Sequence, residues 1–259
     1  MRVLFVTGEF PPMQGGVGDY TCEIALALHQ LGCQVEVATS VQAGPVPDLL
    51  VHPLVEHWSW RCWNTVLKIV HQQQPDVVHI QYQAAAYAMH PAINLMPWRL
   101  RRLGSGRPRI VVTFHDLKVP YLFPKAGPLR QWVVTELARR SDAVVATNRE
   151  DFENLPQGLA SSPSLIPIGS NISPELPTGY DREAWRARWG AKPDDLLLCF
   201  FGFINDRKGV DTLLRALHHL ASETRIPSPD TPYGIADSLL LMIGGQTGAS
   251  DPTNVAYLN

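Results

Sequence analysis

The stretch MRVLFVTGEFPPMQGGVGDY (residues 1–20) decides how the rest of the chain can be interpreted. A short apolar run at residues 3–7 is followed by a glycine-rich loop and then, from Val17 onward, by apolar residues at helical spacing. This order indicates a buried strand, a turn and a helix. Gly15, Gly16 and Gly18 let backbone N–H groups approach a ligand, and the helix adds its positive N-terminal end. We predict an anion site here, most simply for phosphate, with a plain tight turn as the alternative.

These glycines match neither of two familiar phosphate motifs. A dinucleotide fingerprint needs GxGxxG directly after the strand and an acidic residue at the end of the second strand, which here ends in Ala38-Thr39-Ser40. A P-loop needs Gly-Lys-Ser or Gly-Lys-Thr, and neither triplet follows Gly18. The sequence therefore excludes a nicotinamide-type dehydrogenase and a P-loop NTPase.

Short, nearly continuous apolar runs recur along the chain, as expected of strands that are covered on both faces. They lie at residues 3–7, 35–39, 76–80, 110–114, 143–147, 165–168, 196–201 and 239–243. Segments with helical spacing lie between most of them, each with an apolar stripe that should face the core. The stripes are Val17, Tyr20, Ile24, Leu28 and Leu31; Trp60, Trp63, Leu67 and Val70; Leu129, Trp132, Val133 and Leu137; and Val210, Leu213, Leu214 and Leu217. This alternation predicts an α/β fold with a doubly wound parallel sheet.

The chain is longer than one domain usually is, with 259 residues. The segment SPELPTG at residues 173–179 interrupts the pattern and predicts a linker. We expect an N-terminal domain over residues 1–175 and a second one over residues 176–259. Only two strand candidates fall in the second domain, too few for a sheet of typical size, so we expect that domain to be incomplete.

The composition excludes several classes of partner. A net charge of -2 and a pI near 6.5 give no general attraction to nucleic acid, and we expect none as a partner. The four cysteines form no CxxC pair, and no His, Cys and carboxylate set has metal-ligand spacing, so we expect no metal and a reducing cytoplasm. No apolar run approaches the ~18 residues of a membrane span.

A basic stretch follows Trp98. It contains Arg99, Arg101, Arg102, Arg107 and Arg109. We interpret it as a solvated helix end and loop, with weak contact to anionic lipid or to an acidic acceptor as the alternative.

Polar residues follow the predicted strands, where open α/β sheets bind their ligands. Gln83, His115 with Asp116, Asn148 and Asn171 come at or just after strand ends. Together they predict a ligand cleft, although loops are polar in any case. From such a position the His115 imidazole could donate a hydrogen bond or exchange a proton near neutral pH, or it could be a structural histidine.

Residues 200–209, FFGFINDRKG, repeat the order of strand, glycine turn and helix. Arg207 and Lys208 would stand at the helix start, where two cations oppose the helix dipole unless an anion lies nearby. We predict an anion-binding role for this pair, with a solvated basic turn as the alternative.

Five motifs in order resemble the family-4 group of retaining GT-B glycosyltransferases. They are GEFPP with GGVG (8–18), PDVVHIQ (75–81), VTFHD (112–116), IPIGSN (166–171) and FGFI with KGVD (201–211). The resemblance covers nearly the whole chain. It implies two Rossmann-like domains across a cleft, with the acceptor mainly on the first and a nucleotide-sugar donor mainly on the second. The sugar would be transferred with retention and without a metal or other cofactor.

The resemblance also implies roles for the residues singled out above. His115, with Asp116, would lie at the catalytic centre. The residues beside the donor phosphates would be Gly15, Gly16, Gly18, Arg207 and Lys208. Those lining the cleft or the acceptor would be Gln83, Asn148 and Asn171. Cations and amides at the leaving diphosphate would stabilise the charge that grows there in the transition state.

The chain departs from this family pattern in two places. Phe203 stands where members often carry an arginine, and the family's paired glutamates should lie beyond Gly245, whereas no glutamate follows Glu223. We therefore expect this chain alone to transfer little or no sugar. A nucleotide-sugar epimerase-like enzyme and a non-catalytic sugar- or partner-binding module are the alternative hypotheses.

Overall fold

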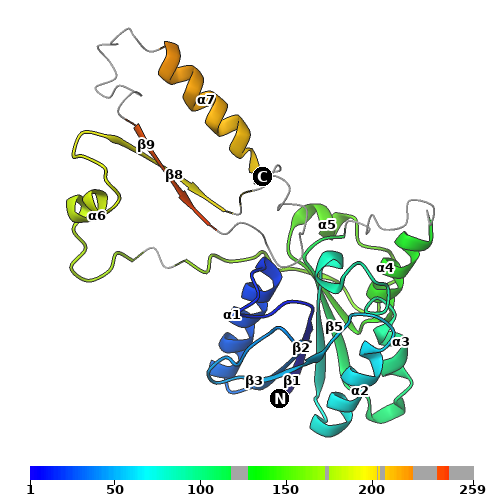
Figure 1. Ribbon diagram of the computed structural model, residues 1–259. Helices are drawn as coiled ribbons and strands as arrows, with labels where there is room; N and C mark the ends of the chain where they lie inside the picture. The colour runs from blue at the N-terminus through cyan, green and yellow to red at the C-terminus, as the bar shows by residue number, and fades with distance from the viewer. Residues whose placement is uncertain (118–127, 173–174, 203, 205–207, 224–237, 245–259) are drawn as a thin grey trace. The chain divides into compact units, whose positions relative to one another are not determined.

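The computed structural model describes residues 1–259 except 118–127, 173–174, 203, 205–207, 224–237 and 245–259 (Figure 1). The chain divides into two compact units, Met1–Asn171 and Ile172–Asn259. The division falls close to the expected boundary between residues 175 and 176. Phe203 and Arg207 lie outside the described residues.

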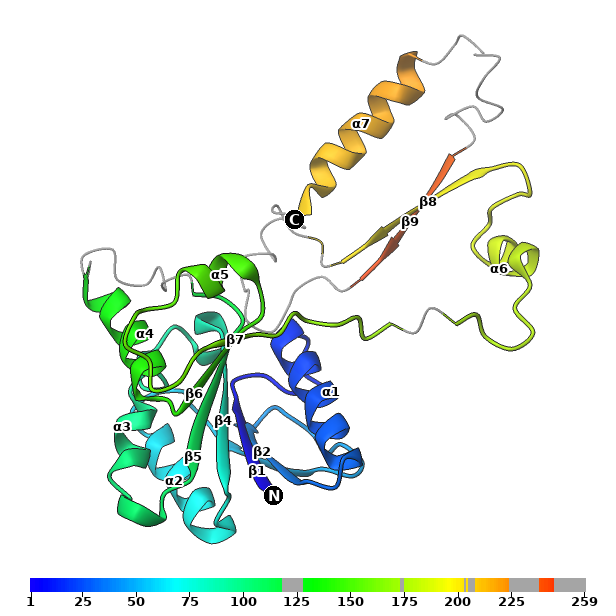
Figure 2. The ribbon, with the colours of Figure 1, turned by 180° about the vertical axis from the view of Figure 1, so that it is seen from behind.

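A parallel sheet forms the centre of the first unit. Its strands are β1 (Arg2–Thr7), β2 (Gln34–Ser40), β3 (Leu50–Val55), β4 (Val77–Tyr82), β5 (Arg109–Phe114), β6 (Ala143–Ala146) and β7 (Ser164–Leu165). They stand in the order β3-β2-β1-β4-β5-β6-β7, and every neighbouring pair is parallel (Figure 2). The strand order reverses between β1 and β4, and the carboxyl ends of these two strands flank the place where such sheets bind ligands. The predicted doubly wound α/β fold is confirmed.

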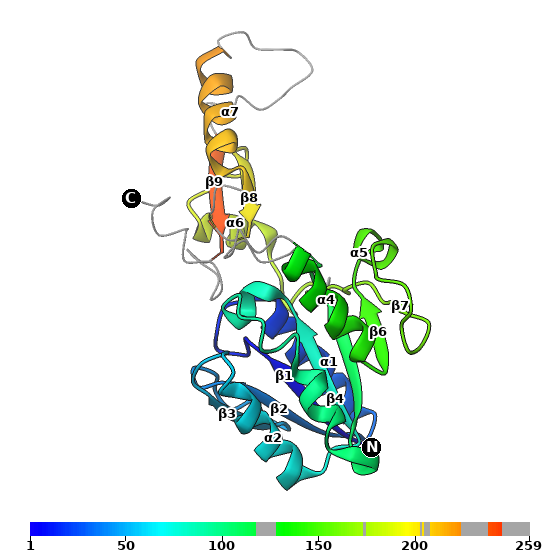
Figure 3. The same cartoon turned by 90° about the vertical axis from the view of Figure 1, so that its right-hand side faces the viewer.

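Helices cover both faces of this sheet. They are α1 (Gly16–Gln30), α2 (Cys62–Gln73), α3 (Met96–Arg101), α4 (Pro128–Arg140) and α5 (Arg149–Glu153), with short 3-10 turns η1 (Ala84–Tyr87) and η2 (Gly104–Gly106). α1 and α2 lie on opposite faces (Figures 1 and 3). Two clusters of buried hydrophobic residues lie on the two faces of the sheet. Within β1, Val3 and Phe5 belong to the smaller cluster on the α1 face, whereas Leu4 and Val6 belong to the larger cluster on the opposite face. This double burial explains why the strands are continuous apolar runs.

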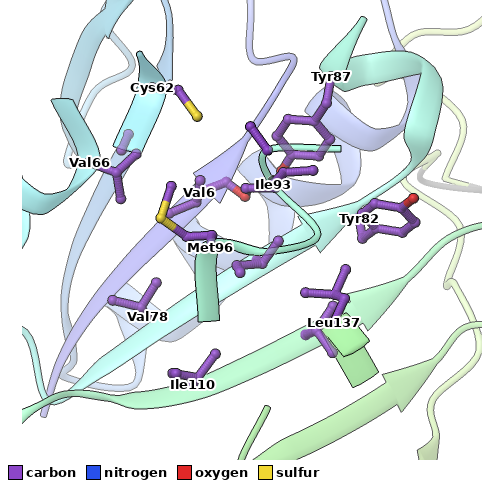
Figure 4. Packing of buried hydrophobic residues seen from close by; sticks show 14 of the residues in the cluster. Val6, Cys62, Val66, Val78, Tyr82, Tyr87, Ile93, Met96, Ile110 and Leu137 are labelled. Atoms are coloured by element: carbon purple, nitrogen blue, oxygen red, sulfur yellow. Dashed lines mark hydrogen bonds between the residues drawn. The ribbon is translucent and has the colours of Figure 1, made fainter. Parts of the chain in front are cut away.

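The larger cluster holds the second helical layer on the sheet (Figure 4). Val78 and Ile110 from the strands belong to it together with Val66 of α2, Met96 of α3 and Leu137 of α4, and all five side chains are fully buried. Burying side chains of this size stabilises the fold by roughly 1.5–3 kcal/mol each.

The structure corrects several details of the prediction. β3 is absent from the predicted strands because His52 and Pro53 interrupt its apolar pattern at the sheet edge. Leu31, predicted on the core stripe of α1, caps the helix and is 79% exposed. Trp60 precedes α2 and is exposed. In α4 the stripe is wrong in part: Leu129 and Trp132 are exposed, and the buried residues are Val133, Val134, Leu137 and Ala138.

The second unit contains a two-stranded parallel sheet among its described residues. It consists of β8 (Leu196–Phe201) and β9 (Ser238–Ile243), with helices α6 (Arg182–Arg188) and α7 (Val210–Glu223). Both strands predicted for this part of the chain are present.

The η1 turn after β4 holds the carboxyl ends of β1 and β4 together. The fully buried Tyr87 hydroxyl lies 2.9 Å from the carbonyl oxygen of Val6 and 2.9 Å from that of Gln81. The turn also approaches β1 so closely that a Cβ at Gly8 would overlap the carbonyl group of Ala86. Position 8 therefore requires glycine because of space, not because of its backbone angles.

Replacing Gly8 tests this close approach. We expect Gly8→Ala to lower the free energy of unfolding by about 1–3 kcal/mol, since the colliding atoms belong to the backbone and cannot move aside as a side chain could. Urea denaturation followed by circular dichroism measures the change. Gly106→Ala is the matched control, because a Cβ there meets nothing within 4 Å. Equal stabilities of the two variants would contradict the packing argument.

Arginines of the basic stretch bind partners within the first unit. Arg107 donates to both carboxylate oxygens of Asp142 at 2.6 and 2.8 Å, and Arg101 donates to the same carboxylate at 3.2 Å. The backbone N–H of Ile110 adds a further bond at 2.8 Å. Hydrogen bonding from Arg107 is the main reason why the pKa of Asp142 falls to about 2. The Arg99 guanidinium lies 5.4 Å from the centre of the Trp63 ring.

Asp142→Asn should therefore destabilise the first unit at pH 7 by about 1–3 kcal/mol, because the variant loses charge-assisted hydrogen bonds. The folded-state pKa is depressed, so this stabilisation is present above the ordinary value near 3.8 and is lost as the pH falls towards 2. Urea denaturation of the unaltered protein and of Asp142→Asn at pH 7 and pH 2.5 shows whether the difference in stability becomes smaller at the lower pH. A difference that stays constant over this range would contradict the assignment to the ionised carboxylate.

Candidate functional site

Two pockets meet at His115, at the carboxyl edge of the sheet. The α1 pocket has a volume of about 600 Å³ and brings together four predicted site residues: Gly16, Gln83, His115 and Asn171. The α5 pocket has a volume of about 480 Å³ and brings together His115, Asp116 and Asn148. Residues from several different segments thus converge on one histidine, as expected at the switch point of an open sheet.

The three glycines of the first loop have different roles. A Cβ at Gly15 would overlap the carboxylate of Glu9, which is 1% exposed. A Cβ at Gly18 would lie 3.1 Å from the carbonyl carbon of Glu9. These two glycines make room for Glu9. Only Gly16 has open space in front of its Cα, and of the three only Gly16 lines the α1 pocket.

Gly16 is also the first residue of α1, and no side chain caps that end of the helix. Uncapped N–H groups of the first turn are what a bound anion would use. Of the three glycines predicted to bind an anion, only Gly16 is placed to do so. Anion binding at Gly16 stays a prediction.

His115 is held from two sides. Its Nε2 lies 2.9 Å from Oε1 of Gln81, and the Tyr20 ring meets it edge to face with ring centres 4.7 Å apart. Burial lowers the pKa of His115 to about 4. The imidazole is consequently neutral at pH 7 and is a hydrogen-bonding group there, not an exchanger of protons near neutrality.

The remaining predicted site residues lie in different parts of the structure. Asn148 lines the α5 pocket but also caps α5, since its Oδ1 accepts a hydrogen bond of 2.8 Å from the backbone N–H of Asp151. Lys208 belongs to the second unit and, with Gly209, directly precedes α7. Arg207, its predicted partner, lies outside the described residues.

The site also contains residues that the sequence pattern does not single out. Asp19 and Glu23 line the α1 pocket, and Tyr20, predicted on the core stripe of α1, lines it too. Gln81 reaches the site from the last position of the motif at residues 75–81. Asp19 could have been predicted from the sequence by its position directly after Gly18, because the first turn of α1 borders the glycine loop.

Neither a metal site nor a membrane span is evident in the part of the chain that the structure describes. No group of three or more His, Cys, Asp or Glu side chains there could hold a metal ion. No helix among these residues has the length and apolarity needed to cross a membrane.

Comparison with known proteins gives a family match. Residues 14–172 match the model of Glycosyltransferase Family 4. A D-inositol 3-phosphate glycosyltransferase of Xylanimonas cellulosilytica is 28% identical over 94% of this chain and 61% of its own length. The chain thus spans about three fifths of that relative.

Solved glycosyltransferases share the fold at low identity. A glycosyltransferase from Rickettsia africae superimposes with a TM-score of 0.58 at 16% identity, over 99% of this chain and 63% of that one. The catalytic domain of starch synthase IV from Arabidopsis thaliana gives a TM-score of 0.57 at 15% identity, over 94% of this chain and 68% of that one.

The protonation of His115 can be measured directly. We expect the ring C–H resonances of His115 to stay constant between pH 8 and pH 5.5 and to move only as the pH approaches 4, because burial disfavours the imidazolium. Proton NMR measures this, with assignment by loss of the signals in His115→Asn and with free imidazole as the internal reference. A midpoint near 6.5 would contradict a ring that is fully neutral at pH 7.

Proposed function

The chain belongs to glycosyltransferase family 4, and on that premise we propose that the whole protein transfers a hexosyl group from a nucleotide-diphosphate sugar to an acceptor, with retention of configuration. The observation that carries the proposal is the meeting of Gly16, Gln83, His115 and Asn171 at one pocket beside the β1–β4 switch point. The name of the Xylanimonas relative and the ADP and acarbose bound to the starch synthase neighbour support it. A cytoplasmic location belongs to the same proposal and agrees with four free cysteines.

Each site residue has a role in this proposal. The N–H of Gly16 and the open end of α1 attract the donor phosphates. Neutral His115 positions a reacting group by hydrogen bonding. Lys208, with Arg207, opposes the charge that develops on the departing diphosphate, so that cations and amides replace a metal ion.

The two alternatives use the same fold differently. An epimerase-like enzyme would act on the donor alone, and a binding module would leave the donor intact. The family match favours transfer over both. Product analysis separates the three, because only transfer yields a glycosylated acceptor.

His115→Ala in the whole protein should lower the rate of transfer by about 10²-fold, a typical cost of losing one positioned hydrogen-bonding group. Nucleotide diphosphate release measures the rate, and NMR of the product gives the anomeric configuration. His57→Ala is the control, since His57 is exposed and lines neither pocket. Unchanged transfer by the His115 variant would contradict the assignment of this pocket as the active site.

The 259-residue chain supplies the second arm of this experiment. It has no glutamate after Glu223, so we propose that by itself it transfers little sugar and binds nucleotides weakly. Micromolar affinity for a nucleotide in calorimetry would place the donor determinants on the first unit instead.

A further inference from the structure

The helices α2, α3 and α4 form one basic layer on the face of the sheet opposite α1. Their buried residues belong to the same hydrophobic cluster, and α3 contacts both α2 and α4. Between Asp76 and Ser141 the sequence contains only two acids, Asp116 and Glu136, against ten lysines and arginines. α2 contains no acid, whereas α1 on the other face has two acids and neither lysine nor arginine. The α2–α3–α4 layer is therefore basic, although the whole chain has a net charge of -2.

The acids that do contact this layer leave it positive. Glu136 is buried and binds Arg140 at 3.1 Å. The carboxylate of Asp142, just after α4, is shared by two arginines. Arg102 at the end of α3 and Arg139 in the last turn of α4 are both exposed. The carbonyl oxygen that Arg139 Nε meets at 3.1 Å carries no full charge. Positive charge thus remains at the surface of the layer.

Tryptophan rings are interleaved with the arginines across all three helices. Trp60 meets Trp63 of α2 edge to face, with 4.9 Å between ring centres. The Arg99 guanidinium of α3 lies over the ring of Trp63. The neighbouring Trp98 meets Trp132 of α4 with 5.8 Å between ring centres. These contacts connect α2, α3 and α4 into a single surface of aromatic rings and cations.

This surface also exposes large apolar side chains. Trp60 and Trp132 are 48% and 40% exposed, and Leu103 and Leu129 are exposed as well. Leu129 and Trp132 are three residues apart on α4 and so lie on the same side of that helix. Exposed apolar side chains that gather beside cations are typical of a binding surface.

We propose that the α2–α3–α4 layer binds the surface of an anionic lipid bilayer. Trp60 and Trp132 lie at the level of the headgroups, where indole rings are favoured, and Arg102 and Arg139 meet the lipid phosphates. Because this layer and α1 cover opposite faces of the sheet, docking leaves the α1 pocket uncovered. The proposal goes beyond sugar transfer and does not depend on it.

A bilayer fits this surface better than nucleic acid or a second copy of the chain does. Nucleic acid binding draws its affinity from many cations, and Asp142 and Glu136 already engage three of the arginines. A second copy seated symmetrically would bring two basic layers together. Only the bilayer offers anionic groups to the arginines and an apolar phase to the tryptophans.

Vesicle sedimentation of the 259-residue chain tests the proposal. We expect binding to vesicles that contain phosphatidylglycerol to be about tenfold tighter, or more, than binding to pure phosphatidylcholine, because each arginine near an anionic surface adds attraction. High salt should release the protein. Equal binding to both kinds of vesicle, or binding to neither, would overturn the proposal.

Tryptophan variants locate the surface. Trp60→Ser combined with Trp132→Ser should weaken vesicle binding several-fold and reduce the quenching of tryptophan fluorescence by brominated lipid. Trp185→Ser combined with Trp189→Ser is the matched control, since these two rings of the second unit are 41% and 46% exposed. The control should change neither readout. An equal effect of both pairs would overturn the assignment to this layer.

Arginine variants test the charge. Arg102→Gln combined with Arg139→Gln should weaken binding to phosphatidylglycerol vesicles about tenfold, whereas Arg182→Gln combined with Arg188→Gln should not. All four side chains are exposed, so circular dichroism should show an unchanged fold.

Two further measurements address the other occupants of this surface. Binding to a single-stranded oligonucleotide that is tighter than binding to vesicles would overturn the proposal. So would a dimer in analytical ultracentrifugation that the Trp60 and Trp132 substitutions dissociate. A monomer that prefers anionic vesicles supports it.

Discussion

The hydroxyl of Tyr87, held between the carbonyl oxygens of Val6 and Gln81, is the contact on which the site depends. β1 and β4 are adjacent in the sheet but distant in sequence, and this hydroxyl joins their ends at the point where the strand order reverses. The turn that carries Tyr87 can reach them only because Gly8 has no side chain. With the two strand ends fixed, Gln81 is fixed as well, and through it the ring of His115.

The glycine loop shows how a motif can be recognised correctly and still be misread in detail. Its residues look like a phosphate cradle, yet Gly15 lies against the buried carboxylate of Glu9 and Gly18 lies against the backbone carbonyl group of the same residue. Buried acids are costly unless their surroundings are specific, so the loop is shaped first by an internal group. Gly16 alone is left facing the pocket. The anion site that we predict is therefore the uncapped first turn of α1, with Gly16 as the glycine that faces the pocket.

Features that depend on burial could be predicted from the sequence, whereas those that depend on tertiary contacts could not. Strands covered on both faces are continuous apolar runs, so β1, β2, β4 and β5 are all predictable, whereas β3 lies at an edge and contains Pro53. The strand-end rule finds His115, Gln83 and Asn171 because topology alone places them. It does not find Asp19 or Glu23, because their sequence pattern is that of an ordinary solvated helix face. Only the tertiary structure places them in one pocket with Ile168.

The two edges of the main sheet also limit what the protein can do with other copies of itself. One edge is β3, where Pro53 offers no N–H to an incoming strand, and the other is β7, which has only two residues. Neither edge is a good template for further strand pairing between molecules. A strongly apolar parallel sheet, which would otherwise be prone to aggregate, therefore ends in two boundaries that oppose fibril-like growth.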